Sequence, residues 1–164
     1  MIELWLDDEA ALGEAYRTAE WEAARRDEPN FLDVSKLSAI PTDERWIVDR
    51  PAPPGCVKNI SFLTRRRDLS VAQFQDYWAH KHGAIASQIP GMRRYVQCHT
   101  RPSAYEREPA PVYDGVPIAW FEDTDAMRGS GGSDAYARTR ADEANFLEPG
   151  AITFVIADEH VILG

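Results

Sequence analysis

The side chain best suited to chemistry in this sequence is His82, which lies in a segment with helical periodicity. Phe74, Trp78, His82 and Ile85 recur at the spacing of one apolar helix face, which turns the imidazole toward the interior of the fold. Because an imidazole titrates near neutral pH, a small change of environment makes it a general acid or a general base. The alternative is a histidine that is only part of the core.

A second group of polar side chains falls on one face of the strand expected over residues 92–101. Tyr95, Gln97, His99 and Arg101 are alternate residues, and alternate residues of a strand share a face. Such a row either lines a cavity or faces solvent at the edge of a sheet. In the first case we expect His99 to act as a second acid or base, or to orient the first.

Aromatic residues accompany both groups. Tyr77, Trp78 and Tyr95 could form the walls of a pocket for a flat molecule, although tyrosine and tryptophan are more often core or interface residues. If these groups line such a pocket, His82 and His99 are its expected catalytic residues. The expected substrate-binding residues are Tyr77, Trp78, Tyr95 and Gln97.

Other kinds of site find no support in the sequence. It contains no glycine-rich phosphate loop, no nucleophile elbow and no metal-ligand spacing. Its two cysteines, Cys56 and Cys98, are far apart and have no second ligand pair, which is typical of buried free thiols. We expect neither a metal nor another cofactor.

Charge and hydropathy argue against a protein that binds nucleic acid or a membrane. The 164 residues carry a formal net charge of −9, whereas proteins that bind nucleic acid or anionic membranes gather lysine and arginine. No apolar run is long enough to cross a membrane, and the first residues lack the basic start of a signal peptide. These features predict a soluble, cytoplasmic protein without nucleic-acid or membrane partners.

The two ends of the sequence resemble each other at a constant offset of 115 residues, which indicates an internal repeat of residues 1–49 and 116–164. The identical pairs are Trp5/Trp120, Asp8/Asp123, Ala11/Ala126, Arg25/Arg140, Asp27/Asp142, Glu28/Glu143, Asn30/Asn145, Phe31/Phe146, Leu32/Leu147, Asp43/Asp158, Glu44/Glu159 and Ile47/Ile162.

The repeat separates the charges. Residues 1–49, 50–115 and 116–164 carry net charges of −8, +5 and −6, so the basic segment can match only one of the two acidic ones within the chain. The repeated pair Asp142 and Glu143 could serve acid–base work. Its duplication and its place at a helix end instead favour a structural role.

Local patterns predict the elements of a ferredoxin-like α+β domain over residues 56–164. Strands are expected over 57–64, 92–101, 118–121 and 152–163. Helices are expected over 70–88, where Ser70 and Gln73 form a capping box, and over 123–141, interrupted by the glycine-rich residues 128–133. The order βαββαβ gives one antiparallel sheet with two helices on one face. The other face must meet something apolar, such as a second sheet.

Residues 1–49 form a half-domain in this scheme, with strands expected over 2–6, 37–40 and 46–48 around a helix over 10–26, and the Pro-rich residues 50–55 link it to the complete domain. In a sheet ordered 4-1-3-2 the last two strands are separated by the first, so the half-domain lacks its central strand. We expect a partner subunit, or upstream residues of a longer tandem protein, to fill this gap.

Several segments resemble the EthD family of the dimeric α+β barrel superfamily: residues 69–86 (LSVAQFQDYWAHKHGAIA), 89–97 (IPGMRRYVQ), 113–121 (YDGVPIAWF), 142–146 (DEANF) and 158–162 (DEHVI). The resemblance implies sheets that pair face to face in a homodimeric α+β barrel, and it places His82 at a position that recurs in the family. Some relatives are cofactor-free enzymes acting on polyketide, aromatic or lactone substrates. Gly83 departs from the family's usual alanine.

These observations together predict a cofactor-independent enzyme for a small hydrophobic, aromatic or polyketide-like molecule. Proton transfer coupled to isomerisation, cyclisation or elimination is the expected reaction, of a lyase, isomerase or monooxygenase-like type. The alternative is a non-catalytic accessory protein that binds a small molecule within an oxygenase degradation system.

Overall fold

The chain is described by a computed structural model over residues 1–162 and divides into two compact units. Unit 1 comprises Met1–Ala39, and unit 2 comprises Ile40–Gly164. The division lies ahead of the expected linker at residues 50–55. The reason is that residues 42–49, expected in the half-domain, form a strand of the sheet in unit 2.

Unit 1 is helical. It contains α1 (Glu9–Ala15), α2 (Ala19–Asp27) and the 3-10 turns η1 (Glu28–Asn30) and η2 (Val34–Lys36). Asp8 and Thr18 cap the two helices by accepting a hydrogen bond from a backbone N–H three residues further on. Residues 2–6 and 37–40, expected as strands, belong to no strand of the structure.

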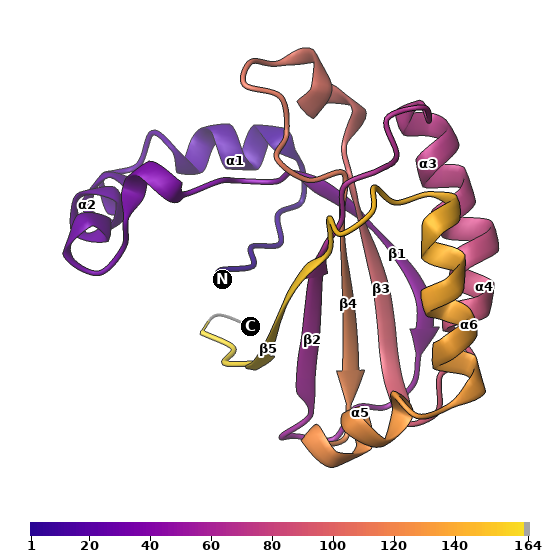
Figure 1. The fold of residues 1–164 in the computed structure, drawn as a ribbon. Coiled ribbons are helices and arrows are strands. Elements are labelled where there is room, and N and C mark those ends of the chain that lie inside the picture. The colour runs from indigo at the N-terminus through magenta and orange to yellow at the C-terminus, as the bar shows by residue number, and fades with distance from the viewer. Residues whose placement is uncertain (163–164) are drawn as a thin grey trace. The chain divides into compact units, whose positions relative to one another are not determined.

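The centre of unit 2 is an antiparallel sheet in the order β1-β3-β4-β2-β5 (Figure 1). Its strands are β1 (Thr42–Asp49), β2 (Val57–Phe62), β3 (Met92–Thr100), β4 (Gly115–Phe121) and β5 (Thr153–Asp158). The four strands from β2 to β5 have the expected ferredoxin-like order, so the fold class is α+β as predicted. β1 extends this sheet by pairing along β3. The end of the last expected strand, Leu163, lies outside the described residues.

Two helical segments connect the strands. The first contains α3 (Val71–Tyr77), the π-helical turn η3 (Trp78–His82) and α4 (Gly83–Ala86). The second contains α5 (Thr124–Ser130), α6 (Asp134–Asp142) and η5 (Glu143–Asn145), and the short 3-10 helix η4 (Pro102–Glu106) follows β3. The predicted capping box is confirmed, since Ser70 and Gln73 each accept a hydrogen bond from the other's backbone N–H. The expected helix interruption is short, and Ser133 caps α6 immediately after it.

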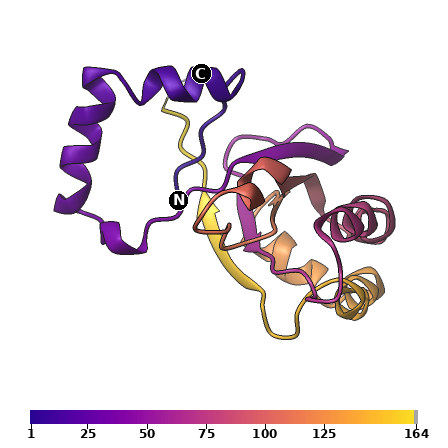
Figure 2. The same cartoon turned by 90° about the horizontal axis from the view of Figure 1, so that it is seen from above.

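The helices of unit 2 cover one face of the sheet (Figure 2). Between them and the sheet lie two apolar clusters, one around Tyr95 and Met92 and one around Phe74, Trp78 and Phe146. A third cluster, around Val96 and other residues that alternate with the helix-facing ones, lies on the opposite face.

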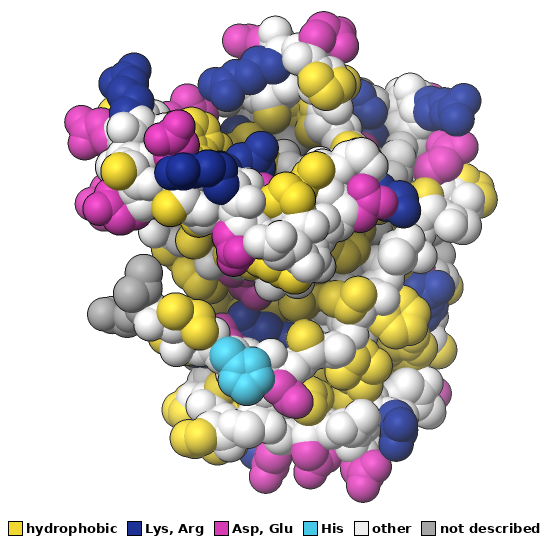
Figure 3. Space-filling view, turned by 90° about the vertical axis from the view of Figure 1, so that its left-hand side faces the viewer, with side chains coloured by type: hydrophobic (Ala, Val, Ile, Leu, Met, Phe, Trp, Pro, Cys, Tyr) yellow, Lys and Arg dark blue, Asp and Glu magenta, His cyan; other side chains and the backbone are white. Residues whose placement is uncertain are grey.

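Apolar side chains also remain at the surface of unit 2. Phe154, Val155 and Ile156 of the edge strand β5 are exposed. Figure 3 shows one face of the chain, on which hydrophobic side chains lie between charged ones. An edge strand of this kind is a natural place for contact with another polypeptide.

Candidate functional site

His82 lies at the end of the π-helical turn η3 and is buried between the helices and the sheet. Its Nδ1 is 2.9 Å from the Oδ2 of Asp142, the last residue of α6. The hydroxyl of Tyr77 donates a hydrogen bond of 2.7 Å to Oδ1 of the same carboxylate, and the amide of Asn145 donates another of 3.0 Å. Two helices therefore bring a histidine, a tyrosine and a carboxylate together.

Close contact between the helix and the sheet fixes the position of His82. A Cβ atom added to Gly83 would lie 3.2 Å from Nε2 of Gln97 and 3.2 Å from Cδ1 of Ile47. Such a distance leaves little room for a methyl group. The presence of Gly83, unusual for the family, thus has a structural reason, because it lets the helix approach β1 and β3.

The charges of the His82 pair are set by burial and by hydrogen bonds. Burial lowers the pKa of His82, and Asp142 opposes this in part. Burial by itself raises the pKa of Asp142, but the hydrogen bonds from Tyr77, His82 and Asn145 outweigh it and lower that pKa. At neutral pH the pair is therefore a neutral imidazole beside a carboxylate.

This charge state also fixes the tautomer of His82. A carboxylate can only accept hydrogen bonds, so Nδ1 carries the proton and donates it to Asp142. The lone pair then lies on Nε2, which is the arrangement of a general base held in place by a carboxylate. Burial and the hydrogen bond to Asp142 raise the pKa of the Tyr77 phenol, which therefore keeps its proton.

The expected polar row on β3 forms a second buried cluster, centred on Gln97. The Gln97 amide donates hydrogen bonds to the Trp78 carbonyl oxygen at 2.9 Å and to the Tyr95 hydroxyl at 3.1 Å. Its Oε1 is 3.1 Å from Nε2 of His99, which must therefore be the donor. Tyr95, Gln97 and His99 thus face the helix and not solvent, whereas Arg101 lies beyond the strand and pairs with Asp43.

Burial is the main electrostatic influence on this cluster as well. It lowers the pKa of His99 to about 4, with a smaller contribution from Arg45. It raises the pKa of Tyr95 to about 12. At neutral pH His99 is therefore an uncharged hydrogen-bond donor and Tyr95 an intact phenol.

Aromatic rings fill the space around the two histidines. Trp78 lies against His99, with ring centroids 4.4 Å apart, and Phe146 lies against His82 at 4.6 Å. Phe74 contacts both Trp78 and Phe146. His82 and His99 are joined by no hydrogen bond in the described part of the chain, so the predicted catalytic residues belong to two clusters.

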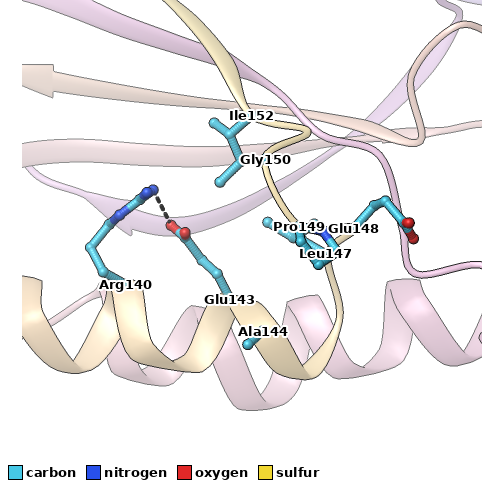
Figure 4. Close-up of a pocket in the computed structure, with 8 residues that line it drawn as sticks. All are labelled: Arg140, Glu143, Ala144, Leu147, Glu148, Pro149, Gly150 and Ile152. Carbon is cyan, nitrogen blue, oxygen red and sulfur yellow. Dashed lines mark hydrogen bonds and ion pairs between the residues drawn. The ribbon is translucent and has the colours of Figure 1, made fainter.

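An open hollow of about 280 Å³ lies where α6 ends (Figure 4). Arg140 and Glu143 form an ion pair of 2.7 Å at its wall, and Leu147 and Ile152 also line it. Burial raises the pKa of Glu143. None of the six predicted site residues lines this hollow, and Glu143, which does line it, directly follows Asp142 in the sequence.

Sequence reasoning assigned Asp142 a structural role and did not consider Phe146 for the site. The only signal for them was the repeated Asp-Glu-x-Asn-Phe-Leu motif, which does not reveal which residues it contacts. Within residues 1–162 no group of three His, Cys, Asp or Glu side chains is arranged to hold a metal ion, and no helix is long and apolar enough to cross a membrane.

Several solved structures are similar to this chain. An EthD family protein of Bacillus halodurans is 18% identical, with 64% of this chain and 99% of that chain covered at a TM-score of 0.52. A proposed monooxygenase of Lactobacillus acidophilus is 10% identical, with 91% and 63% covered at 0.50. SnoaB, a cofactor-independent oxygenase of Streptomyces nogalater, is 18% identical, with 66% and 96% covered at 0.46.

Sequence comparison identifies the family. No curated protein sequence matches the chain significantly. The EthD domain pattern matches residues 66–150, which include η3, β3, α6 and the buried pair His82 and Asp142. The match covers more than half of the chain, and the protein therefore belongs to the EthD family.

Proposed function

We propose that this protein is a cofactor-independent enzyme that moves a proton on a small hydrophobic, aromatic or polyketide-like molecule. The observation that carries the proposal is the buried chain of hydrogen bonds from His82 and Tyr77 to Asp142. Asp142 holds the proton of His82 on Nδ1, which leaves the lone pair on Nε2, as a general base requires.

Each polar group has a role in this reaction. Nε2 of His82 takes a proton from an acidic C–H or O–H of the substrate, and Asp142 stabilises the imidazolium that forms. The imidazolium then returns the proton to another atom, which completes an isomerisation, a cyclisation or an elimination. His99 remains neutral and orients the Gln97 side chain, through which it acts on the substrate.

The hollow beside Glu143 provides the entrance for the substrate in this proposal. Its volume of about 280 Å³ suits a molecule of one or two rings. Tyr77, Trp78, Tyr95 and Gln97 bind the substrate as it reaches His82, with the aromatic rings against its flat face. This requires the rings of the helix–sheet layer to shift when the substrate enters.

Exchange of α-hydrogens in 2-tetralone, an aromatic ketone, tests the proposal. In D₂O the protein is expected to speed deuterium incorporation, measured by proton NMR. His82→Gln should slow the catalysed exchange by roughly 100-fold or more. The matched control is His80→Gln, since His80 is an exposed histidine two residues away. Loss of exchange in both variants, or in neither, contradicts the role of His82.

A non-catalytic binding protein is the second candidate. It is favoured by the complete burial of Phe74, Trp78 and Phe146, which leaves the histidines surrounded by packed rings. This candidate predicts that 2-tetralone binds with an affinity independent of pH and without deuterium exchange. Calorimetric titration between pH 5 and 8 together with the NMR assay separates the two candidates.

A further inference from the structure

Unit 1 has the same local structure as the end of unit 2, at the offset of 115 residues. The helices α1 and α2 and the turn η1 begin and end 115 residues before α5, α6 and η5. The caps Asp8 and Thr18 correspond in the same way to Asp123 and Ser133. The same helical segment therefore occurs twice in the chain.

The polar contacts at the end of this segment also occur twice. Asn30 donates a 2.8 Å hydrogen bond to Asp27, as Asn145 does to Asp142. Arg25 and Glu28 form an ion pair of 2.9 Å, as Arg140 and Glu143 do. Unit 1 therefore holds a carboxylate in the local geometry that Asp142 has in the His82 cluster.

The apolar residues of the two segments differ in their surroundings. Phe146 is completely buried and Trp120 is 6% exposed, whereas the corresponding Phe31 and Trp5 are 65% and 64% exposed. The exposed ring of Phe31 indicates that unit 1 lacks the cover that Phe146 has in unit 2.

Unit 2 identifies the kind of polypeptide that covers this surface. Phe146 packs against Phe74, Tyr77 and His82 of the first helical segment. Backbone hydrogen bonds join Arg66 to Phe146 and Glu148 to Thr64. The cover of the repeated segment is thus the strand–helix–strand part of unit 2, residues 57–100.

Net charge and the contacts within unit 2 indicate which polypeptide covers unit 1. Residues 50–115 carry a net charge of +5 and cover a segment of −6, and unit 1, residues 1–39, also carries a net charge of −6. In a second copy of this chain residues 57–100 are already covered by that copy's own β4, α6 and β5. The surface therefore needs an additional basic segment.

We propose that unit 1 binds a further strand–helix–strand segment that is similar in sequence to residues 57–100. In this complex Asp27 accepts a hydrogen bond from the segment's counterpart of His82, which forms a second His–Asp pair. The bound segment is basic and presents aromatic rings to Phe31. The second pair rests on the proposed function for its activity, whereas the binding surface does not depend on it.

A fusion that supplies the missing segment tests the surface. A copy of residues 50–115 is placed directly before Met1 of the full chain, because Met1 corresponds to Val116. Hydrogen exchange measured by mass spectrometry is expected to slow about 10-fold or more over residues 19–32 compared with the unfused chain. Phe31→Ala should abolish this protection in the fusion and change little in the unfused chain. The control is Val34→Ala, since Val34 is also exposed.

Three results overturn the proposed surface. One is unchanged exchange over residues 19–32 in the fusion. Another is protection that survives Phe31→Ala. The third is an unfused chain that is already protected there and that Phe31→Ala converts from dimer to monomer, because a second copy is then the occupant.

The second pair has a readout of its own. In the fusion, Asp27→Asn is expected to lower the NMR titration midpoint of the added segment's copy of His82, because a carboxylate favours the imidazolium. Asp33→Asn, at an exposed carboxylate of unit 1, should leave that midpoint unchanged. Equal midpoints in all three proteins contradict the pair even when the segment binds. Neither readout uses turnover, so failure here is distinct from failure of the proposed enzyme.

Discussion

At the scale of single residues, burial decides what the two predicted catalytic histidines do. His82 has a carboxylate partner that holds its proton on Nδ1, whereas His99 has only the neutral Gln97. A neutral imidazole beside a carboxylate is suited to accept a proton, and one beside an amide is suited to orient. We therefore propose different roles for these two histidines, a base for His82 and an orienting residue for His99.

His99 should make the stability of the protein depend on pH. Its pKa is about 4 in the folded protein and near 6.5 when unfolded. The unfolded state thus binds more protons between these values, so stability is full above about pH 6.5 and falls as the pH drops toward 4. The difference corresponds to roughly 3 kcal/mol. Urea unfolding at pH 7 and pH 4.5 measures it.

His99→Gln is the comparison for this experiment. The variant lacks the titrating group, so its free energy of unfolding should fall less between pH 7 and pH 4.5 than that of the natural protein. Equal losses in the two proteins would show that other groups cause the acid sensitivity.

At the scale of elements, the sequence predicts what local patterns determine. The capping box of Ser70 and Gln73, the shared face of Tyr95, Gln97 and His99 and the order of the four ferredoxin-like strands all follow from spacing. The pairing of β1 with β3 does not, because it depends on contacts between residues such as Thr42 and Thr100 that are distant in sequence.

For the candidate site too, local patterns predict which way a side chain faces but not which distant residue it contacts. Helix periodicity places His82 on an inward face, and strand alternation places His99 opposite the helix. The partner of His82 lies 60 residues away, at the end of another helix. Only the three-dimensional structure identifies Asp142 as that partner, since Asp27 ends α2 in the same sequence motif.

Packing between η3 and β4 gives a prediction at this scale. A Cβ atom on Gly115 would lie 2.4 Å from Cζ3 of Trp78, which is fully buried and cannot move aside. Gly115→Ala should therefore destabilise the protein by roughly 1–3 kcal/mol. Gly129→Ala, in α5 with no atom within 4 Å, should be neutral or stabilise by up to about 1 kcal/mol. Thermal unfolding checks both, and equal effects contradict the close contact.

At the scale of the whole molecule, a sheet that carries helices on one face leaves apolar surface for another polypeptide. The exposed side chains of β5, Phe154, Val155 and Ile156, belong to the end of the sheet where no further strand pairs within the described residues. A homodimer that uses this strand is the arrangement we propose for unit 2.

Ile156→Glu should convert this dimer to a monomer, because it places a charge in an apolar interface. Sedimentation velocity measures the change. The control is Val112→Glu, at an exposed valine in the loop before β4, which should leave the dimer intact. A natural protein that sediments as a monomer, or an Ile156→Glu variant that remains dimeric, contradicts this interface.

We propose that His82, held by Asp142, moves protons as a base. The most direct test is the pH dependence of deuterium exchange into 2-tetralone, measured by NMR for the natural protein and for Asp142→Asn. Burial lowers the pKa of His82 below 6.5, so the natural protein should exchange at a constant rate at neutral pH and lose activity below pH 6.5. The Asp142→Asn variant should be roughly 10-fold slower or more throughout. A rate that does not fall on acidification, or an Asp142→Asn variant as fast as the natural protein, contradicts the proposed role of His82 and Asp142.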